Sequence, residues 1–157
     1  MAITIGTNGW CTAAQVRVRI VQFSASIAAG TGLVTDTTVE GLITARFRRI
    51  QATTLNRGYT AAGILADTNA LGYVETLNVL GAAADTLYAL AAAALPSSPA
   101  LADVHERQAT EMLEDIAKGR VDLGALENDV EAGPSITTTL RTGGTYATPV
   151  LTKATVF

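Results

Sequence analysis

The residues whose side chains could do chemistry are few and lie far apart along the 157-residue chain. Metal sites and covalent catalysis need histidine, cysteine or carboxylate side chains brought together in defined sets. The chain has one cysteine, Cys11, and one histidine, His105. No second histidine or lysine motif supports activation of the thiol. We therefore expect Cys11 to be a small apolar packing residue and His105 to face solvent or flank its helix.

Glu111, Glu114 and Asp115 lie within one helical turn, a spacing at which two carboxylates can share acid–base work. Such a cluster is usually the solvated face of a helix. Two glycine-rich stretches, 30–32 and 143–144, lack the lysine of a phosphate-binding loop and the spacing of a dinucleotide-binding motif. No Gly-x-Ser-x-Gly elbow is present. The sequence predicts no catalytic site, no cofactor and no metal, and we expect the protein not to be an enzyme.

The composition indicates one compact helical domain. Apolar residues make up 48% of the chain and charged residues 16%, and aromatic residues are only 5%, so helices with small side chains can pack closely. The single cysteine excludes an internal disulfide and favours a reducing compartment. The N-terminus lacks the pattern of a signal peptide. The apolar run 79–95 is too short for a membrane span of about 20 residues. We expect a soluble protein made in the cytoplasm, with no membrane partner.

The net charge of −3 does not require a nucleic-acid partner, but its distribution is uneven. Residues 1–60 are mainly basic and residues 103–131 are mainly acidic. The two halves could face each other within one fold, or could meet across neighbouring copies in a head-to-tail ring. The acidic total argues against DNA binding as the main task. The candidates for charged contacts between subunits are Arg46, Arg48, Arg49, Glu111, Glu114 and Asp115.

The positioning elements follow from apolar periodicity and capping signals. Residues 1–11 predict a short extended arm and turn. Thr12 and Gln15 have the spacing of a capping box, which predicts a helix continuing to about residue 27. A second capping box at Thr37 and Glu40 predicts a helix that ends near Gly58, with a loop over 59–69.

The third helix, over 71–95, is the most apolar and should be buried on more than one side. The fourth runs over 99–118, with Ser98 as its cap, Pro99 at its first position and Gly119 as its stop. Its predicted apolar face consists of Leu101, Val104, Gln108, Met112 and Ile116.

The C-terminal part differs in kind from the helical domain of residues 12–124. Residues 125–157 predict a linker and an extended, threonine-rich and β-prone arm, with no acidic residue after 134. The arm either pairs with the N-terminal segment or adds itself to a partner's surface. The arm residues expected to make such contacts with a partner or a neighbouring subunit are Ile136, Leu140, Tyr146, Val150, Leu151, Val156 and Phe157.

The segment 111–123, with the sequence EMLEDIAKGRVDL, resembles the end of the last helix in head–tail adaptor (connector) proteins of long-tailed phages, including the Mu-type neck protein group. The element Arg57-Gly58-Tyr59 is comparable to an Arg-x-Tyr element that ends the family's second helix, and the likeness in layout covers about residues 10–123. The central helix is richer in alanine, and the tail longer, than the family pattern. The residues that match the closing pattern are Leu113, Asp115, Ile116, Ala117, Gly119, Val121 and Leu123.

This resemblance implies a four-helix adaptor domain assembled as a ring of twelve copies in the virion neck. Its partners would be the portal above and a stopper or tail-side neck protein below, with DNA passing through the lumen without specific binding. The acidic helix could line that channel. Two alternatives stay open: another virion component, such as a tail-completion or minor capsid protein, and a small helical DNA-binding regulator.

Overall fold

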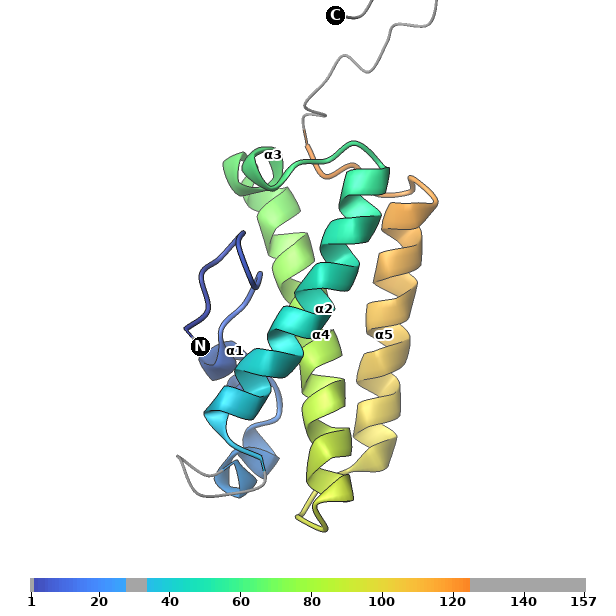
Figure 1. The fold of residues 1–157 in the computed structure, drawn as a ribbon. Coiled ribbons are helices and arrows are strands. Elements are labelled where there is room, and N and C mark those ends of the chain that lie inside the picture. The colour runs from blue at the N-terminus through green and yellow to red at the C-terminus, as the bar shows by residue number, and fades with distance from the viewer. Residues whose placement is uncertain (1, 28–33, 125–157) are drawn as a thin grey trace, which may run out of the picture.

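A computed structural model describes residues 2–27 and 34–124 of the chain. The described part is mainly α-helical, which confirms the predicted fold class (Figure 1). The predicted C-terminal arm lies outside the described residues. The helices are α1 (Ala13–Arg19), the 3-10 helix η1 (Val21–Ser26), α2 (Asp36–Asn56), α3 (Ala61–Ala66), α4 (Thr68–Ala92) and α5 (Pro99–Ala117).

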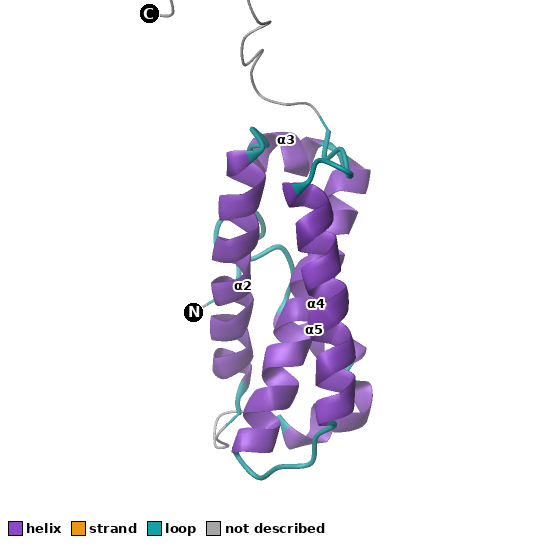
Figure 2. Ribbon diagram, turned by 90° about the vertical axis from the view of Figure 1, so that its right-hand side faces the viewer, coloured by secondary structure: helices purple, strands orange, loops and turns teal. Residues whose placement is uncertain are grey.

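Helix α4 is the centre of the domain and packs against α1, α2, α3 and α5. Figure 1 shows α2 crossing in front of α4 and α5 beside α4, and Figure 2, turned by 90°, shows α2 on one side of the α4–α5 pair. The prediction that this helix is buried on more than one side is confirmed, because Leu80, Leu87 and the alanines 82–84 are all buried. A Cβ atom at Gly81 would lie 3.0 Å from Cδ of Arg46, so this glycine gives the arginine side chain room to cross α4.

The N-terminal segment is part of the core. Its turn has Gly6 at φ +79°, the left-handed region that favours glycine, and Trp10 and Cys11 are buried. The backbone N–H of Trp10 donates to Oδ1 of the buried Asn78 over 2.8 Å, and Nδ2 of Asn78 donates to the carbonyl of Ile43 over 3.2 Å. The predicted turn is present, but the end of the predicted arm is fixed between α2 and α4.

The bounds of α1 and α2 differ in part from the predicted ones. The capping box of Thr12 and Gln15 is confirmed, but α1 ends at Arg19 and the chain continues as η1 instead of one helix to residue 27. The start of α2 at Thr37 was wrong, because Thr35 caps this helix and Thr38 completes the capping box. The sequence offers both registers, and the observed one places Asp36 in the first turn, where a carboxylate interacts favourably with the helix dipole.

The loop predicted over 59–69 was wrong, because the short α3 begins there after the capping side chain of Thr60. Helix α4 then starts at Thr68, capped by Asp67. It ends at Ala92, three residues before the predicted end. Gly58 takes the expected left-handed conformation after α2, at φ +84°.

Helix α5 has the predicted cap at Ser98 and Pro99 in its first turn, but its buried face is rotated from the predicted one. Val104 is 37% exposed, whereas His105 is only 4% exposed; the prediction of a solvent-facing histidine was wrong. The prediction from the sequence placed the large apolar side chains on the buried face of the helix. The alanine-rich surface of α4 instead accepts small residues at close approach. The buried residues of α5 are Ala102, His105, Ala109 and Ile116.

Candidate functional site

The closing segment that carries the family resemblance turns the chain back onto the core after α5. Ile116 and Leu123 are buried, and Leu113 and Val121 are partly buried against the same core cluster. Gly119 ends the helix at φ +68°, a conformation in which most side chains are strained. The predicted helix stop at Gly119 and the predicted burial of Ile116 are confirmed. Ala117 is exposed and Asp115 partly exposed at the end of the helix.

The other segment that carries the resemblance, Arg57-Gly58-Tyr59, contacts the closing segment. The hydroxyl of Tyr59 donates to the carbonyl of Val121 over 3.4 Å. A Cβ atom at Gly119 would lie 2.1 Å from Nη2 of Arg57, so the guanidinium covers this glycine. We call this region, residues 57–59 and 116–124, the closing end. Figure 1 shows it beside α3, where the described chain finishes.

Arg46, one of the predicted intersubunit residues, forms ion pairs within the chain. Its Nε and Nη2 atoms each lie 2.6 Å from an oxygen of Asp85, and Nη1 lies 3.1 Å from Oε1 of Glu106. The hydrogen bonds to Asp85 raise the pKa of Arg46 above its usual range, and those to Glu106 add to the effect, against the opposing influence of burial. The pair with Glu106 joins the basic and acidic halves of the sequence inside one fold, which was one of the two alternatives.

Asp85 and Glu106 were not predicted as the partners of this arginine. The signal was present for Asp85, because a carboxylate inside an apolar helix is rarely buried without a partner. The side chains of Arg46 and Asp85 are 16% and 24% exposed, and that of Glu106 is 31% exposed. The cluster therefore ties α2, α4 and α5 together at a partly buried position.

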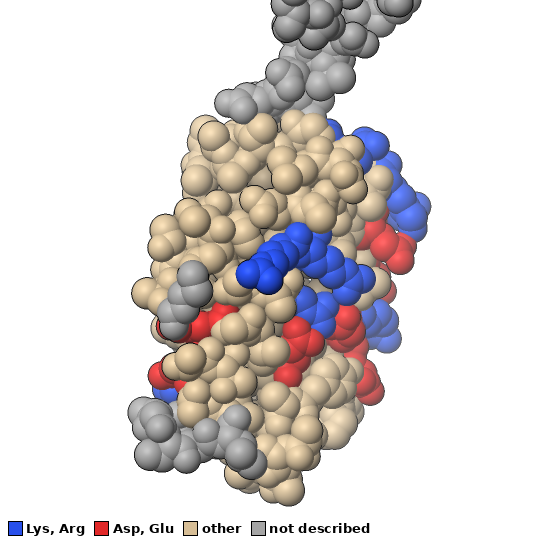
Figure 3. Space-filling view, viewed as in Figure 1, with Lys and Arg blue, Asp and Glu red and all other residues tan. Residues whose placement is uncertain are grey.

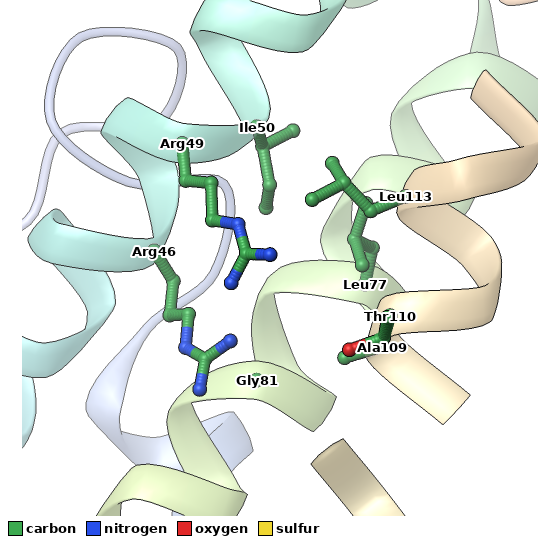
Figure 4. A pocket seen from close by; sticks show the side chains of 8 residues that line it. All are labelled: Arg46, Arg49, Ile50, Leu77, Gly81, Ala109, Thr110 and Leu113. Atoms are coloured by element: carbon green, nitrogen blue, oxygen red, sulfur yellow. The ribbon is translucent and has the colours of Figure 1, made fainter. Parts of the chain in front are cut away.

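Arg48 and Arg49 are exposed on α2, and neither has an ion-pair partner among the described residues. A shallow groove of about 10 Å³, room for about one water molecule, lies beside Arg49 between α2, α4 and α5, and Arg48 does not line it. Figure 4 shows the guanidinium groups of Arg46 and Arg49 on one side of it and Thr110 on the other. Figure 3 shows basic side chains gathered over the middle of this face, above acidic ones. The groove is lined by Arg46, Arg49, Ile50, Leu77, Gly81, Ala109, Thr110 and Leu113.

The three acidic candidates on α5 have different surroundings. Glu114 pairs with Lys118 one turn later, and this hydrogen bond lowers the pKa of the Glu114 carboxyl. Asp115 lies 3.2 Å from Nη1 of Arg120. Glu111 is exposed, and the described residues give it no ion-pair partner. Glu114 and Asp115 therefore each have a basic partner nearby in sequence, at the solvated end of α5.

The two residues considered for covalent or metal chemistry are both buried. Cys11 has no exposed surface, and burial, with a smaller effect of Glu75, raises its pKa to about 12. Burial lowers the pKa of His105, and the charge of Arg19 lowers it further. Within residues 2–27 and 34–124, no group of histidine, cysteine and carboxylate side chains could hold a metal ion. No helix of this part is long and apolar enough to cross a membrane.

The residues predicted to form the docking arm, from Ile136 to Phe157, lie outside the described residues. The described chain finishes at Gly124, next to Asp67 at the start of α4. The arm therefore begins at the closing end. No family model, curated protein or solved structure matches this chain.

Proposed function

We propose that this chain is a structural virion protein, a head–tail adaptor whose copies form a ring between the portal and the next neck or tail protein. The observation that carries the proposal is the contact between the two segments of the resemblance. They are separated by more than fifty residues, yet the hydroxyl of Tyr59 reaches the carbonyl of Val121. A chance similarity in sequence would not require these two segments to contact each other in the folded chain.

The surfaces of the domain support a binding role of this kind. Arg48 and Arg49 on α2 and Glu111 on α5 are exposed charges of opposite sign on different helices. A head-to-tail ring needs two different surfaces on each copy, because every subunit uses one face toward each neighbour. Residues 125–157 begin at the closing end and are long enough to reach a neighbouring protein, since an extended chain spans roughly 3.3 Å per residue.

The arm would dock on the portal or on neighbouring subunits, and the ring would extend the DNA channel. In such a role no bond is made or broken. The acidic face of α5 is our candidate for the surface toward the lumen, where negative charge keeps DNA from adhering. DNA would then pass without specific contacts.

The experiment that tests the proposal mixes the purified full chain with portal rings or tailless heads from the same source, followed by cryo-electron microscopy. We expect a ring of density beneath the portal. A truncation that removes residues 134–157 should weaken or abolish docking, and a truncated chain that docks normally would refute the role of the arm. A protein that ignores the portal and binds along the tail or shell would instead be another virion component. A salt-sensitive shift of DNA by the free protein would favour the regulator.

A further inference from the structure

After α5 the chain crosses the end of the bundle in a short segment that has few bonds to the rest of the domain. The last backbone hydrogen bond of the helix end runs from the N–H of Arg120 to the carbonyl of Asp115, over 2.8 Å. Residues 121–124, which we call the strap, form no backbone–backbone hydrogen bond with any residue that the structure describes. Figure 1 shows the strap at the end of the orange segment, where the chain runs from α5 toward α3. Its position therefore depends on side-chain contacts.

Two kinds of side-chain contact fix the strap. Leu123 is 1% exposed and belongs to the core cluster that contains Tyr59 and Ile116, and Val121 packs partly buried against the same cluster. The hydroxyl of Tyr59 donates to the carbonyl of Val121 over 3.4 Å, which exceeds the roughly 2.5–3.0 Å of a typical O–H···O bond. One fully buried leucine is therefore the main anchor of the strap.

Glycines with positive φ lie on both sides of the anchor. Gly119 has φ +68° and Gly124 has φ +91°, and glycine passes between backbone conformations more easily than any other residue. Hinges are short stretches of this kind, in which a few residues absorb a large change of φ and ψ. A rotation at Gly119 would move the strap without disturbing α5, because the helix ends at Ala117.

Opening of the strap should cost less free energy than unfolding of the domain. It exposes one fully buried and one partly buried side chain, and it returns conformational entropy to the backbone of four residues. Unfolding of the domain also exposes the core between α2, α4 and α5. Segments with few buried contacts and few backbone hydrogen bonds are those that open locally while the rest of a protein stays folded.

We propose that the strap is a hinged closure, which opens about Gly119 and withdraws Leu123 from the core while the helices stay folded. Residues 125–157 follow the strap directly in the sequence, so a partner that binds them pulls on it. Opening adds roughly 13 Å to their reach, at about 3.3 Å for each residue of the strap, and uncovers the apolar end of the core. The opening itself does not depend on the proposed adaptor role. If that role is correct, docking of the arm favours the open form.

The first test compares Leu123→Ala with Ile116→Ala in the full chain by thermal unfolding. Leucine and isoleucine side chains are isomers, and these two are both buried in the same core cluster. Leu123→Ala can remove no more stability than the closed strap contributes, because the open form is still folded. Ile116 lies within α5, where no such limit applies. We expect a clearly smaller fall in Tm for Leu123→Ala. Equal falls, or a Leu123→Ala chain that does not fold, would overturn the proposal.

The second test measures the opening directly, by reaction of a thiol reagent with Leu123→Cys and with the matched control Ile116→Cys. Cys11 is fully buried and adds the same slow background to both. The thiol introduced at position 123 should react at least about tenfold faster, which corresponds to a difference of about 1.4 kcal/mol in opening free energy. Its rate should change little in low urea, because local opening exposes little surface, whereas the rate of the control should rise steeply. Equal rates, or equal dependence on urea, would contradict the proposal. Failure to bind the portal would leave both tests unaffected.

Discussion

Replacing Arg46 with methionine tests whether the ion-pair cluster holds three helices together. Methionine keeps an unbranched apolar stem over Gly81 but removes the guanidinium, so Asp85 and Glu106 lose their shared cation. Both carboxylates are more than two-thirds buried as side chains, at 24% and 31% exposed. The variant therefore leaves two negative charges facing each other at a position with limited access to water.

The size of the effect follows from burial and hydrogen bonding. Removing one member of a fully buried ion pair costs about 3–5 kcal/mol, whereas an exposed pair contributes about 0–1 kcal/mol. Arg46 is 16% exposed and binds both carboxylates, which places this cluster between the limits. We expect Arg46→Met to lower the free energy of unfolding by about 2–3 kcal/mol. For a domain of this size, that corresponds to a fall in Tm of roughly 8–12 °C.

The assay is thermal and urea unfolding of the full chain at pH 7, with Arg48→Met as the matched control. Arg48 is exposed and lacks a partner in the described part of the chain, so its replacement should change stability by less than about 0.5 kcal/mol. Equal effects of the two substitutions on the free energy of unfolding would refute the reasoning.

Three further predictions concern single positions. Thr35→Ala removes the cap of α2 and should lower the free energy of unfolding, measured with urea, by about 1 kcal/mol, whereas Thr37→Ala should be nearly neutral. A larger loss for Thr37→Ala than for Thr35→Ala would support the helix start at Thr37 that was predicted from the sequence. Gly119→Ala should cost about 1–2 kcal/mol because of its positive φ, and a neutral result by the same assay would show that the turn relaxes at little cost. Burial lowers the pKa of His105 below 6.5. The unfolded state therefore binds more protons as pH falls, and Tm should drop below pH 6.5 in the native chain but less in His105→Gln. An equal drop in both would remove His105 as the cause.

The local sequence predicted the helices well where capping and periodicity agreed. Thr12, Ser98 and Pro99 mark helix starts by side-chain bonds or backbone geometry that involve residues at most three positions away. Such signals need no tertiary context. Where two registers were available, as around Thr35 and Thr37, or where a helix was as short as α3, local signals were insufficient.

The candidate site was predictable in part. The helix stop at Gly119 and the apolar position of Ile116 were predicted from the sequence, and the backbone conformation of Gly119 and the burial of Ile116 agree with this. The partners of Arg46 were not, because Asp85 is 39 residues away and Glu106 is 60 residues away. Pairing over such separations depends on how α2 and α5 cross α4, and no local pattern encodes that crossing.

The sequence by itself thus determined a mainly helical domain with an apolar central helix, because alanine content, caps and apolar spacing act within a few residues. Only the tertiary structure decided which face of α5 is buried and that Arg46 is used inside the chain. It alone decided that the residues around Tyr59 meet those around Val121. The physical reason is that burial and ion pairing depend on the three-dimensional packing of residues far apart in sequence, and a small alanine can be as buried as a leucine when two helices approach closely.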